Sequence, residues 1–362
     1  MSLTVVKDLR AQREPPTAEE IEALETDVLS GFVLARSSAG WADSTVRGDV
    51  RALNALRSWL SKPLWEMDPN DADRYFGKHL KSAAKQTKRS AAATISIFFT
   101  YLEKRHYAEL YNLTGRAPES PIDELNRPRG NQDTLIRIPP PEAVLTALFA
   151  HWRADLNETR KFNTEARDYI ACRLMAMIGI RINETSKLDL DDINEAPELG
   201  RLPKLHIRYG KGAYGSGPKT RIVPLINGAD MLLEWYAHEV RSEFDDPEHW
   251  SRPGAPLFCS ERRHPDGSAR RVGVSSLRQG LTDAVERYVP EWKGKITPHV
   301  LRHYCASELY RTGMDLIAIQ ELLGHEWIAT TMRYVHVLRS HVEDSWVKAS
   351  ARTQRRISGA QS

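Results

Sequence analysis

The chain has 362 residues, of which 41% are hydrophobic and 27% charged, with a formal net charge of +3 and a pI near 8.6. This composition is typical of a soluble globular protein and excludes a disordered chain, and the length predicts two domains. The net charge is only mildly basic, so a nucleic-acid partner would require a local concentration of Lys and Arg. Three cysteines without CxxC spacing exclude a disulfide framework and a cysteine zinc site.

The sequence carries no pattern of a secreted or membrane protein. Its first ten residues, MSLTVVKDLR, lack the charged-then-apolar order of a signal peptide. The longest apolar run, near 169–180, contains Arg173 and is too short to cross a bilayer. We therefore expect a cytoplasmic protein without a membrane partner.

The first part of the chain has the periodicity of a helical domain. Residues 14–27 are acidic, which favours a solvated helix or tail. From 44 to 60, apolar residues recur at every third or fourth position before Pro63, so this segment predicts a helix that ends at the proline. A longer helix is predicted over 71–105, because its later half places apolar residues on one face.

Basic residues gather in the middle of this longer helix. Lys81, Lys85 and Lys88 fall on one stripe, and Arg89 lies beside it. Such a stripe is consistent with contacts to DNA phosphates, each of which would add to the salt dependence of binding. It is equally consistent with a solvated lysine face, and the residues themselves leave both interpretations open.

A proline-rich stretch at 112–140 predicts a linker to a second domain. Helices are predicted at 141–152 and 165–178, the latter ending at Gly179. Alternation then predicts strands at 205–209 and 221–225, which the Gly-rich loop GKGAYGSGPKT joins into a hairpin. A third strand is expected at 188–193, and from 231 onward the pattern is mostly helical.

We thus predict a mainly α protein with a small antiparallel β-sheet, in which a helical domain precedes an α+β domain. The predicted segments are an N-terminal tail at 1–16, a helical DNA-binding domain at 17–111, a linker at 112–140, a catalytic domain at 141–350 and a mobile tail at 351–362.

The second domain contains an HxxR pair at a predicted helix start. Thr297 fits the N-cap and Pro298 the first turn, so His299 and Arg302 lie on one face near the positive end of the helix. The pair would suit two oxygens of one phosphate. HxxR alone is a weak motif, and a capping histidine with a surface arginine is the plain alternative.

Two further polar residues follow a second predicted helix. Asp315 caps its start and Gly324 its end, which places His325 at a defined position just beyond the helix. Tyr334 stands nine residues later. Alone, Tyr334 would more often be a core or surface tyrosine, but the combination of spacings disfavours that interpretation.

A metal site is a rival interpretation of the same region. His299 and His303 have zinc-ligand spacing, and His325 would be a third ligand. No HExxH motif occurs, however, and Arg302 lies inside the cluster, where a guanidinium would disfavour a cation. We expect neither a metal nor another cofactor.

The Gly-rich loop resembles a P-loop, but Pro218 interrupts the required Gly-Lys step and a strand follows where a P-loop needs a helix. We therefore exclude nucleotide binding there. A lysine of this hairpin would still reach a phosphodiester, and Lys211 and Lys219 are the candidates.

Taken together, these blocks resemble the tyrosine recombinase family, also called the phage integrase family. The resemblance covers most of the chain, and its specific motifs lie in 135–350; residues 17–111 are similar to the family's SAM-like core-binding domain only in pattern. Asn183 stands where the family often has Ser, and the Gly-rich loop is longer than usual. The motifs that carry the resemblance are GIRINETSKL with Arg181 and Glu184, YGKG followed by TRIVPL, HVLRH, LLGH and TTMRYVHV.

The resemblance implies a role for each matched residue. Arg181 and Arg302 would clamp the phosphodiester, and Tyr334 would be the nucleophile. His299 is the expected base, His325 a phosphate ligand, and the hairpin lysine the proton donor to the leaving 5′ oxygen, with Lys211 preferred and Lys219 the alternative. Glu184 is expected to orient Arg181 or a histidine, although an ordinary helix-turn glutamate is the alternative.

The implied function is site-specific recombination of double-stranded DNA, by two rounds of strand exchange within a homotetramer. The alternatives are a type IB topoisomerase, which would nick and reseal one duplex, and a DNA-binding relative without catalysis. The separate helical domain and the order of the motifs favour recombination. The sequence leaves open whether accessory proteins take part, and whether the segment after Tyr334 packs on its own subunit or on a neighbour.

Overall fold

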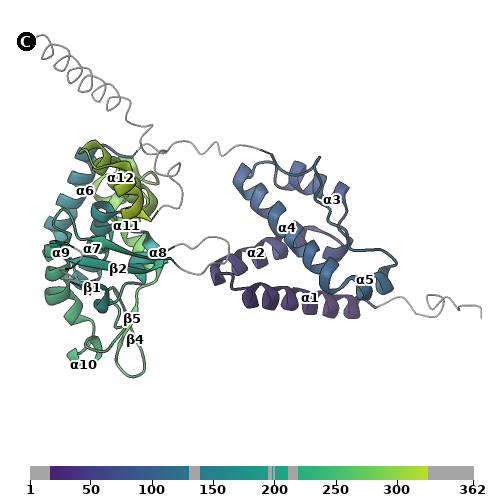
Figure 1. Cartoon of the computed structure of the whole chain (residues 1–362), viewed down its shortest axis with the longest axis horizontal. Helices are drawn as coiled ribbons and strands as arrows, with labels where there is room; N and C mark the ends of the chain where they lie inside the picture. Colours follow the sequence, from purple (N-terminus) through teal and green to yellow (C-terminus); the bar gives the residue numbers. More distant parts are fainter. Residues whose placement is uncertain (1–16, 130–138, 195–197, 199, 211–218, 325–362) are drawn as a thin grey trace, which may run out of the picture. The chain divides into compact units, whose positions relative to one another are not determined.

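The computed structural model describes residues 17–129, 139–194, 198, 200–210 and 219–324. These residues form two compact units, an N-terminal one that ends by residue 129 and a C-terminal one that begins at 139 (Figure 1). Each unit has a hydrophobic core of its own. None of the helices in the described ranges is both long and apolar enough to cross a membrane.

The secondary structure of the N-terminal unit is helical throughout its described residues, with turns and loops between the helices. Its helices pack around a core that includes Phe32, Leu53 and Phe98. A buried ion pair between Arg36 and Asp49 joins the first two helices. The helices are α1 (Ala18–Ser38), α2 (Asp43–Trp59), α3 (Pro69–Arg74), α4 (Lys85–Arg105) and α5 (Tyr107–Thr114).

The acidic stretch belongs partly to α1 and is not simply solvated. Thr17 caps the helix by accepting a hydrogen bond from the backbone N–H of Glu20. Glu25 is buried, and its carboxylate accepts a hydrogen bond from the backbone N–H of Leu64. One of the acidic residues therefore holds the segment after α2 against α1.

The prediction of a single helix over 71–105 is wrong, because the chain turns in the middle of this segment. A π-helical turn at Tyr75–His79 follows α3, and α4 begins only at Lys85. Tyr75 and Phe76 are buried, which draws this turn into the core and breaks the helical path. Lys81 thus lies in a turn before α4, where its carbonyl accepts a hydrogen bond from Lys88 Nζ.

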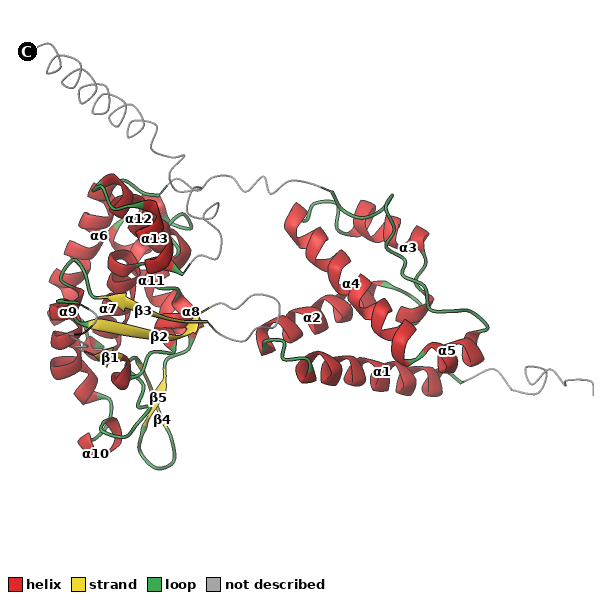
Figure 2. Cartoon of the chain, in the orientation of Figure 1, coloured by secondary structure: helices red, strands yellow, loops and turns green. Residues whose placement is uncertain are grey.

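The C-terminal unit is built around α7, against which α6, α11 and α12 pack (Figure 2). Eleven of the 17 residues of α7 are buried, and the helix ends at Gly179 as predicted. The longer helices are α6 (Glu142–Asp155), α7 (Phe162–Ile178), α11 (Val274–Tyr288) and α12 (Pro298–Arg311). The shorter ones are α8 (Ile182–Ser186), α9 (Ala229–Trp235), α10 (Pro247–Trp250) and α13 (Leu316–Leu323).

A three-stranded antiparallel sheet has the order β1-β2-β3. Its strands are β1 (Ile193–Asn194), β2 (Lys204–Gly210) and β3 (Lys219–Pro224). The predicted hairpin is confirmed, since Leu205 pairs with Val223 and Gly210 with Lys219. The third strand is much shorter than the predicted 188–193, because a 3-10 turn occupies Leu190–Asp192.

The described residues from 231 onward are mostly helical, as predicted, but they include a second hairpin that the sequence did not predict. Strands β4 (Cys259–Arg263) and β5 (Ala269–Arg271) pair in antiparallel fashion. Its anchors are distant in sequence: Arg167 donates to the Cys259 carbonyl, and the Ala269 N–H donates to Asp245. Such long-range contacts leave no local periodicity for a sequence pattern to detect.

Candidate active site

The candidate site is organised by the C-terminal end of α13. Asp315 caps the start of this helix and Gly324 its end, in the left-handed conformation at φ 64, as the sequence predicted. The last carbonyls of a helix lack partners within the helix and carry its negative dipole end. They therefore provide acceptors for cationic side chains.

Three arginines donate to three consecutive carbonyls at this end. Arg221 Nε binds the Leu322 carbonyl at 3.0 Å, Arg302 Nη2 the Leu323 carbonyl at 2.6 Å, and Arg181 Nη2 the Gly324 carbonyl at 3.3 Å. The arginines come from β3, from α12 and from the start of α8. Arg181 and Arg302, more than 100 positions apart in sequence, are thereby brought to one helix end. We call Arg181, Arg221 and Arg302 the arginine cluster.

Arg181 is placed by the turn between α7 and α8. Gly179 ends α7 at φ 69, Ile180 is fully buried, and Arg181 is the N-cap of α8. A Cβ on Gly179 would overlap the Leu323 side chain, so glycine is needed for both the backbone conformation and the approach of α13. The Arg181 side chain is 27% exposed.

Arg302 lies inside the C-terminal unit, with 1% of its surface exposed. Its Nη1 donates to the Gly179 carbonyl and its Nη2 to the Leu323 carbonyl. The same guanidinium thus joins the turn that carries Arg181 to the end of α13. A buried guanidinium keeps its charge, since its pKa is far above any working pH.

Glu184 is the anionic partner of two of these arginines. Its side chain is almost fully buried and accepts from Arg181 Nη1 at 2.7 Å and from Arg221 Nη1 and Nη2 at 2.9 and 2.8 Å. It also accepts from the backbone N–H of Arg181. Burial alone would raise the pKa of this carboxyl, but the hydrogen bonds and charge of Arg221, followed by those of Arg181, lower the pKa to about 2.

His299 lies in the first turn of α12, whose start matches the prediction: Thr297 is the N-cap and Pro298 the first residue. The histidine is exposed, and its ring packs edge-to-face on His303 with the centroids 4.4 Å apart. Within the described ranges, no group of three His, Cys, Asp or Glu side chains is arranged to hold a metal ion.

The hairpin lysines fall on either side of a boundary of the described residues. Lys219 begins β3 and is exposed, and its carbonyl faces Gly210 so closely that a Cβ there would overlap it. Lys211 directly follows β2, and it lies outside the described residues together with His325 and Tyr334. The arginine cluster nevertheless holds Gly324, the residue immediately before His325.

Arg221 is the site residue that sequence analysis did not identify. It lies two residues before the fully buried Val223 and therefore on the same face of β3. A signal was present in TRIVPL, because an arginine on the core-facing side of a strand requires a buried acceptor. Which acceptor it meets depends on tertiary contacts that no local pattern encodes.

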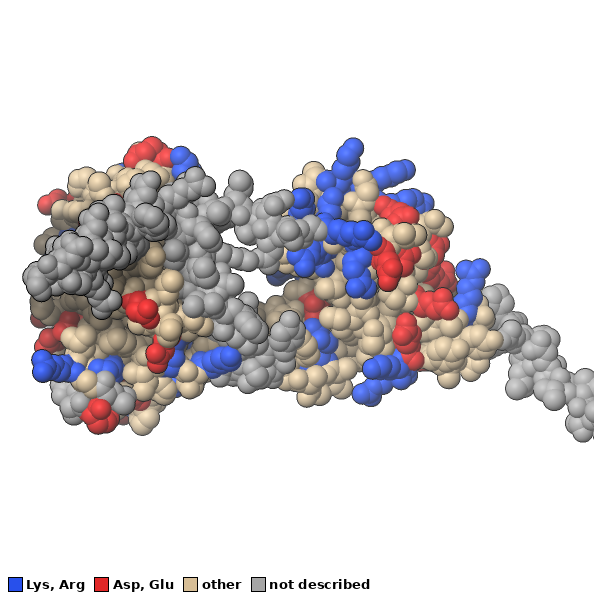
Figure 3. Space-filling model, turned by 45° about the horizontal axis from the view of Figure 1, so that its top comes forward, with Lys and Arg blue, Asp and Glu red and all other residues tan. Residues whose placement is uncertain are grey.

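The basic residues proposed for DNA contact lie in the N-terminal unit. Lys81, Lys85 and Arg89 are exposed, whereas Lys88 is half-buried. Lys and Arg side chains gather on one part of this unit, with acidic side chains next to them (Figure 3). The first turn of α4 contains no acidic residue, so its positive dipole end adds to the lysines.

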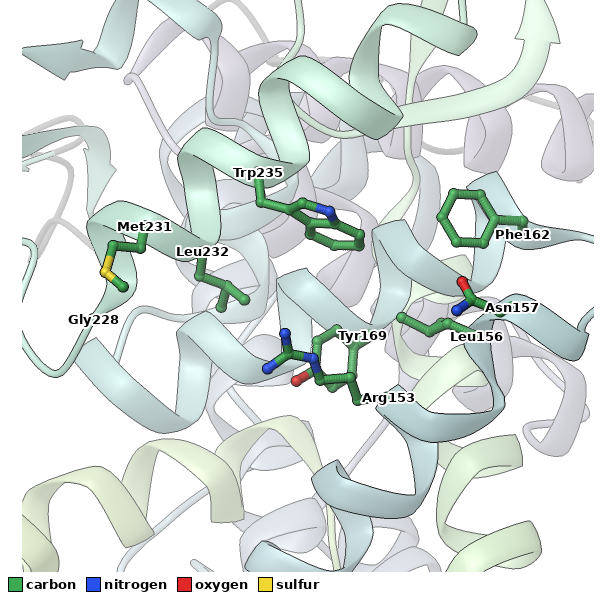
Figure 4. Close-up of a pocket in the computed structure, with 9 residues that line it drawn as sticks. All are labelled: Arg153, Leu156, Asn157, Phe162, Tyr169, Gly228, Met231, Leu232 and Trp235. Carbon is green, nitrogen blue, oxygen red and sulfur yellow. The ribbon is translucent and has the colours of Figure 1, made fainter.

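A pocket of about 400 Å³ lies elsewhere in the C-terminal unit (Figure 4). None of the predicted site residues lines it. The arginine cluster therefore remains the candidate site. The lining residues are Arg153, Leu156, Asn157, Phe162, Tyr169, Gly228, Met231, Leu232 and Trp235.

Comparison with known proteins decides the family. Residues 152–341, more than half of the chain, match the phage integrase family. The chain belongs to this family. It is thus a tyrosine recombinase, an enzyme of site-specific recombination, as the resemblance in its sequence predicted.

Curated relatives and solved structures agree with this assignment. The tyrosine recombinase XerD of Listeria monocytogenes serotype 4b (strain F2365) is 26% identical over 313 residues, covering 84% of this chain and 92% of the relative. Tyrosine recombinase XerC of Actinobacillus succinogenes (strain ATCC 55618 / DSM 22257 / CCUG 43843 / 130Z) is 31% identical over 196 residues, covering 53% and 56%.

Two solved structures share the fold. The XerH site-specific recombinase bound to palindromic difH substrate has a TM-score of 0.57 at 19% identity, covering 91% of this chain and 84% of that one. The Tn1549 transposon integrase in complex with transposon right end DNA has a TM-score of 0.56 at 15% identity, covering 88% and 98%. At these identities the likeness shows the fold alone.

Proposed function

We propose that this recombinase cuts and rejoins DNA at the arginine cluster, through a covalent 3′-phosphotyrosyl intermediate. The observation that carries the proposal is the convergence of Arg181 and Arg302 on the carbonyls of Leu323 and Gly324, next to His325 in the sequence. The positive charge of two guanidiniums at one point suits a phosphodiester and the negative charge that grows in its transition state.

The reaction needs a nucleophile, a base and an acid. Tyr334 is the proposed nucleophile; its phenol has an ordinary pKa near 10, so a base must remove its proton. His299, exposed at the start of α12, is assigned this role, and His325 is assigned to a phosphate oxygen. Lys211, or alternatively Lys219, would protonate the leaving 5′ oxygen.

In this scheme one phosphodiester bond exchanges its 5′ oxygen for the tyrosyl oxygen, and the free 5′ hydroxyl of another strand later reverses the exchange. The covalent bond conserves the energy of the phosphodiester, so the chemistry itself requires neither ATP nor a metal ion. The arginines supply the positive charge that a metal supplies in other phosphoryl-transfer sites.

The proposed substrate is double-stranded DNA with a specific site, bound by a homotetramer. In support, XerH is bound to palindromic difH substrate and the Tn1549 integrase to transposon right end DNA, and the N-terminal unit carries the exposed Lys81, Lys85 and Arg89. Lys88 is proposed as part of the same contact. Residues 17–111 would then serve as the DNA-binding domain and 141–350 as the catalytic domain.

Covalent capture on a nicked suicide substrate tests the proposal. The substrate loses a short fragment after cleavage, so the wild-type chain should accumulate a protein–DNA adduct that withstands denaturing gel electrophoresis. Tyr334→Phe should bind the same DNA, by gel shift, and form no adduct. An adduct formed by Tyr334→Phe would assign the nucleophile to another residue.

The assignment of the acid is tested with a 5′-thio leaving group. A thiolate departs without a proton, so the variant that lacks the true acid regains cleavage on this substrate. We expect rescue of Lys211→Ala and little change for Lys219→Ala. Rescue of Lys219→Ala alone would reverse the assignment, and rescue of neither would exclude the hairpin.

A supercoil-relaxation assay beside a two-site recombination assay separates recombination from the topoisomerase alternative. Recombinant products with both sites present are expected. Relaxation of site-free plasmids without recombinants would favour a type IB topoisomerase-like activity.

A further inference from the structure

Arg221 has contacts that no assigned role explains. It donates through Nε to the Leu322 carbonyl and through Nη1 and Nη2 to the two oxygens of Glu184. Its side chain is 12% exposed. Within the described residues, its hydrogen bonds go only to Glu184 and to the end of α13.

We propose that Arg221 is a positioning residue for strand cleavage: it fixes Glu184, and through it Arg181, in register with the end of α13 from which His325 follows. This inference rests on the proposed function, because it assigns Arg221 to the same site. Arg221 itself is not expected to contact the scissile phosphate.

The first argument is the sharing of Glu184. Oε1 accepts from Nη1 of Arg181 and Nη1 of Arg221, and Oε2 accepts from the Arg181 backbone N–H and from Nη2 of Arg221. Each carboxylate oxygen is therefore shared between the two arginines. Because Arg221 occupies part of both oxygens, Arg181 engages Glu184 through Nη1 and directs Nη2 to Gly324.

The second argument is the geometry of the guanidinium. Its Nε and its two Nη groups point in different directions in one plane, so Arg221 links a carboxylate on α8 with a carbonyl on α13. A lysine has a single nitrogen at this position and would not form the same planar pattern. The identity of the residue, and not only its charge, is therefore expected to matter.

The third argument is the close fit of Gly324 to this side chain. A Cβ on Gly324 would lie 2.9 Å from Arg221 Cδ and 3.2 Å from Nε, and the residue has φ 64. Only glycine lets the end of α13 approach Arg221 in this conformation without displacement. The position of Gly324, the last described residue of this segment, thus depends directly on where Arg221 lies.

Arg208 offers a matched control on the neighbouring strand β2. It is also an arginine bound to buried carboxylates, Asp189 and Asp192, but it has no hydrogen bond to the arginine cluster among the described contacts. Arg208→Met should therefore lower stability without a specific effect on cleavage.

The experiment measures single-turnover cleavage of the suicide substrate, DNA affinity and thermal unfolding for the wild type and for Arg221→Met, Arg221→Lys and Arg208→Met. A displacement of about 1 Å at a reacting centre costs on the order of 100-fold in rate. We expect Arg221→Met to cleave about 100-fold more slowly with DNA affinity within a few-fold of wild type. Arg221→Lys should be closer to the wild type in thermal stability but should recover only part of the rate, and Arg208→Met should cleave at the wild-type rate.

A double-mutant cycle with Glu184→Gln tests the route of the effect. If Arg221 acts through Glu184, Arg221→Met should slow cleavage far less in the Glu184→Gln background than in the wild type. Wild-type cleavage rates in both Arg221 variants, or equal slowing in both backgrounds, would overturn the inference while leaving the proposed function intact. Absence of any adduct with the wild-type chain would instead refute the proposed function, and this inference with it.

Discussion

Two buried carboxylates of the C-terminal unit, Glu184 and Asp168, meet arginines in opposite ways. Glu184 binds the guanidiniums of Arg181 and Arg221, which lower its pKa to about 2 despite its burial. Asp168 has the guanidinium of its neighbour Arg167, and burial raises its pKa to about 6, with Arg167 only partly offsetting that rise. The two sites have similar burial but a different balance of charge.

The difference separates a site built for an anion from a pair built for packing. At the arginine cluster, two guanidiniums bind the Glu184 carboxylate and a third, that of Arg302, binds backbone carbonyls, so positive charge remains in excess for a phosphate. At Asp168 one cation faces one anion, and Arg167 also donates to the Cys259 carbonyl of β4. The first arrangement predicts effects on activity and the second predicts effects on stability.

The largest expected effect is on stability, from Arg167→Met. Removing one partner of a buried pair leaves the other charge uncompensated and typically costs about 3–5 kcal/mol of the free energy of unfolding. Urea denaturation at pH 8 would measure this loss. The loss should be smaller at pH 5, because Asp168 then takes up a proton; an equal loss at both pH values would contradict this account of the pair.

Arg181→Met should show the opposite pattern. Removal of one transition-state donor costs about 3 kcal/mol, so cleavage should fall by roughly 100- to 1,000-fold. Stability should change by less than about 1 kcal/mol, because Glu184 keeps its two hydrogen bonds to Arg221. A variant that loses several kcal/mol of stability would show that Arg181 is a packing residue like Arg167, and the contrast would collapse.

The dependence of stability on pH sharpens the same comparison. The pKa of Glu184 is lowered from its ordinary value of 4.5 to about 2, so its stabilising contribution is present above pH 4.5 and is lost as pH falls toward 2. The pKa of Asp168 is raised from 3.8 to about 6, so its contribution is present below pH 3.8 and is lost as pH rises through 6.

Each pKa unit corresponds to about 1.4 kcal/mol, so both contributions are on the order of 3 kcal/mol. Glu184→Gln should remove the acid-side slope of the unfolding free energy, and Asp168→Asn the slope of opposite sign between about pH 4 and 6. Denaturation of the wild type and both variants across pH 2–8 gives, for each variant, the difference in unfolding free energy from the wild type. This difference should change with opposite sign between about pH 2 and 4.5 for Glu184→Gln and between about pH 4 and 6 for Asp168→Asn. Changes of the same sign would show that the two carboxylates do not differ in the way proposed.

The separation in sequence between contacting residues explains what the sequence alone predicted. Caps such as Thr297 and Asp315, the end of α13 at Gly324, and the β2-β3 hairpin were found because their signals lie within a few residues. Arg181 and Arg302 were predicted as site residues because the motifs around them are local and resemble a family. Arg221, which lies 37 residues from Glu184, was missed because only the folded chain brings the two together.

The structural errors have the same origin. The helix predicted over 71–105 breaks where Tyr75 and Phe76 turn into the core, and the β4-β5 hairpin depends on partners such as Asp245, 24 residues from Ala269. Periodicity reports which face of a segment is apolar, and not whether a distant group will bend it. Residues whose function is a contact between distant segments are thus the ones that a sequence pattern is expected to miss.

The smallest expected effect is on the salt dependence of DNA binding, and it tests whether the basic residues of the N-terminal unit contact DNA phosphates. Lys81 lies before the start of α4 and Lys104 in its last turn, and both are exposed. If Lys81 contacts a phosphate, Lys81→Ala should reduce the slope of log K against log salt concentration by about 0.9, because one fewer counterion is released. Lys104→Ala, the matched control, should leave the slope unchanged. Equal slopes for Lys81→Ala and the wild type would assign this lysine to the solvated surface, and the parallel between the two units would then rest on Lys85, Lys88 and Arg89.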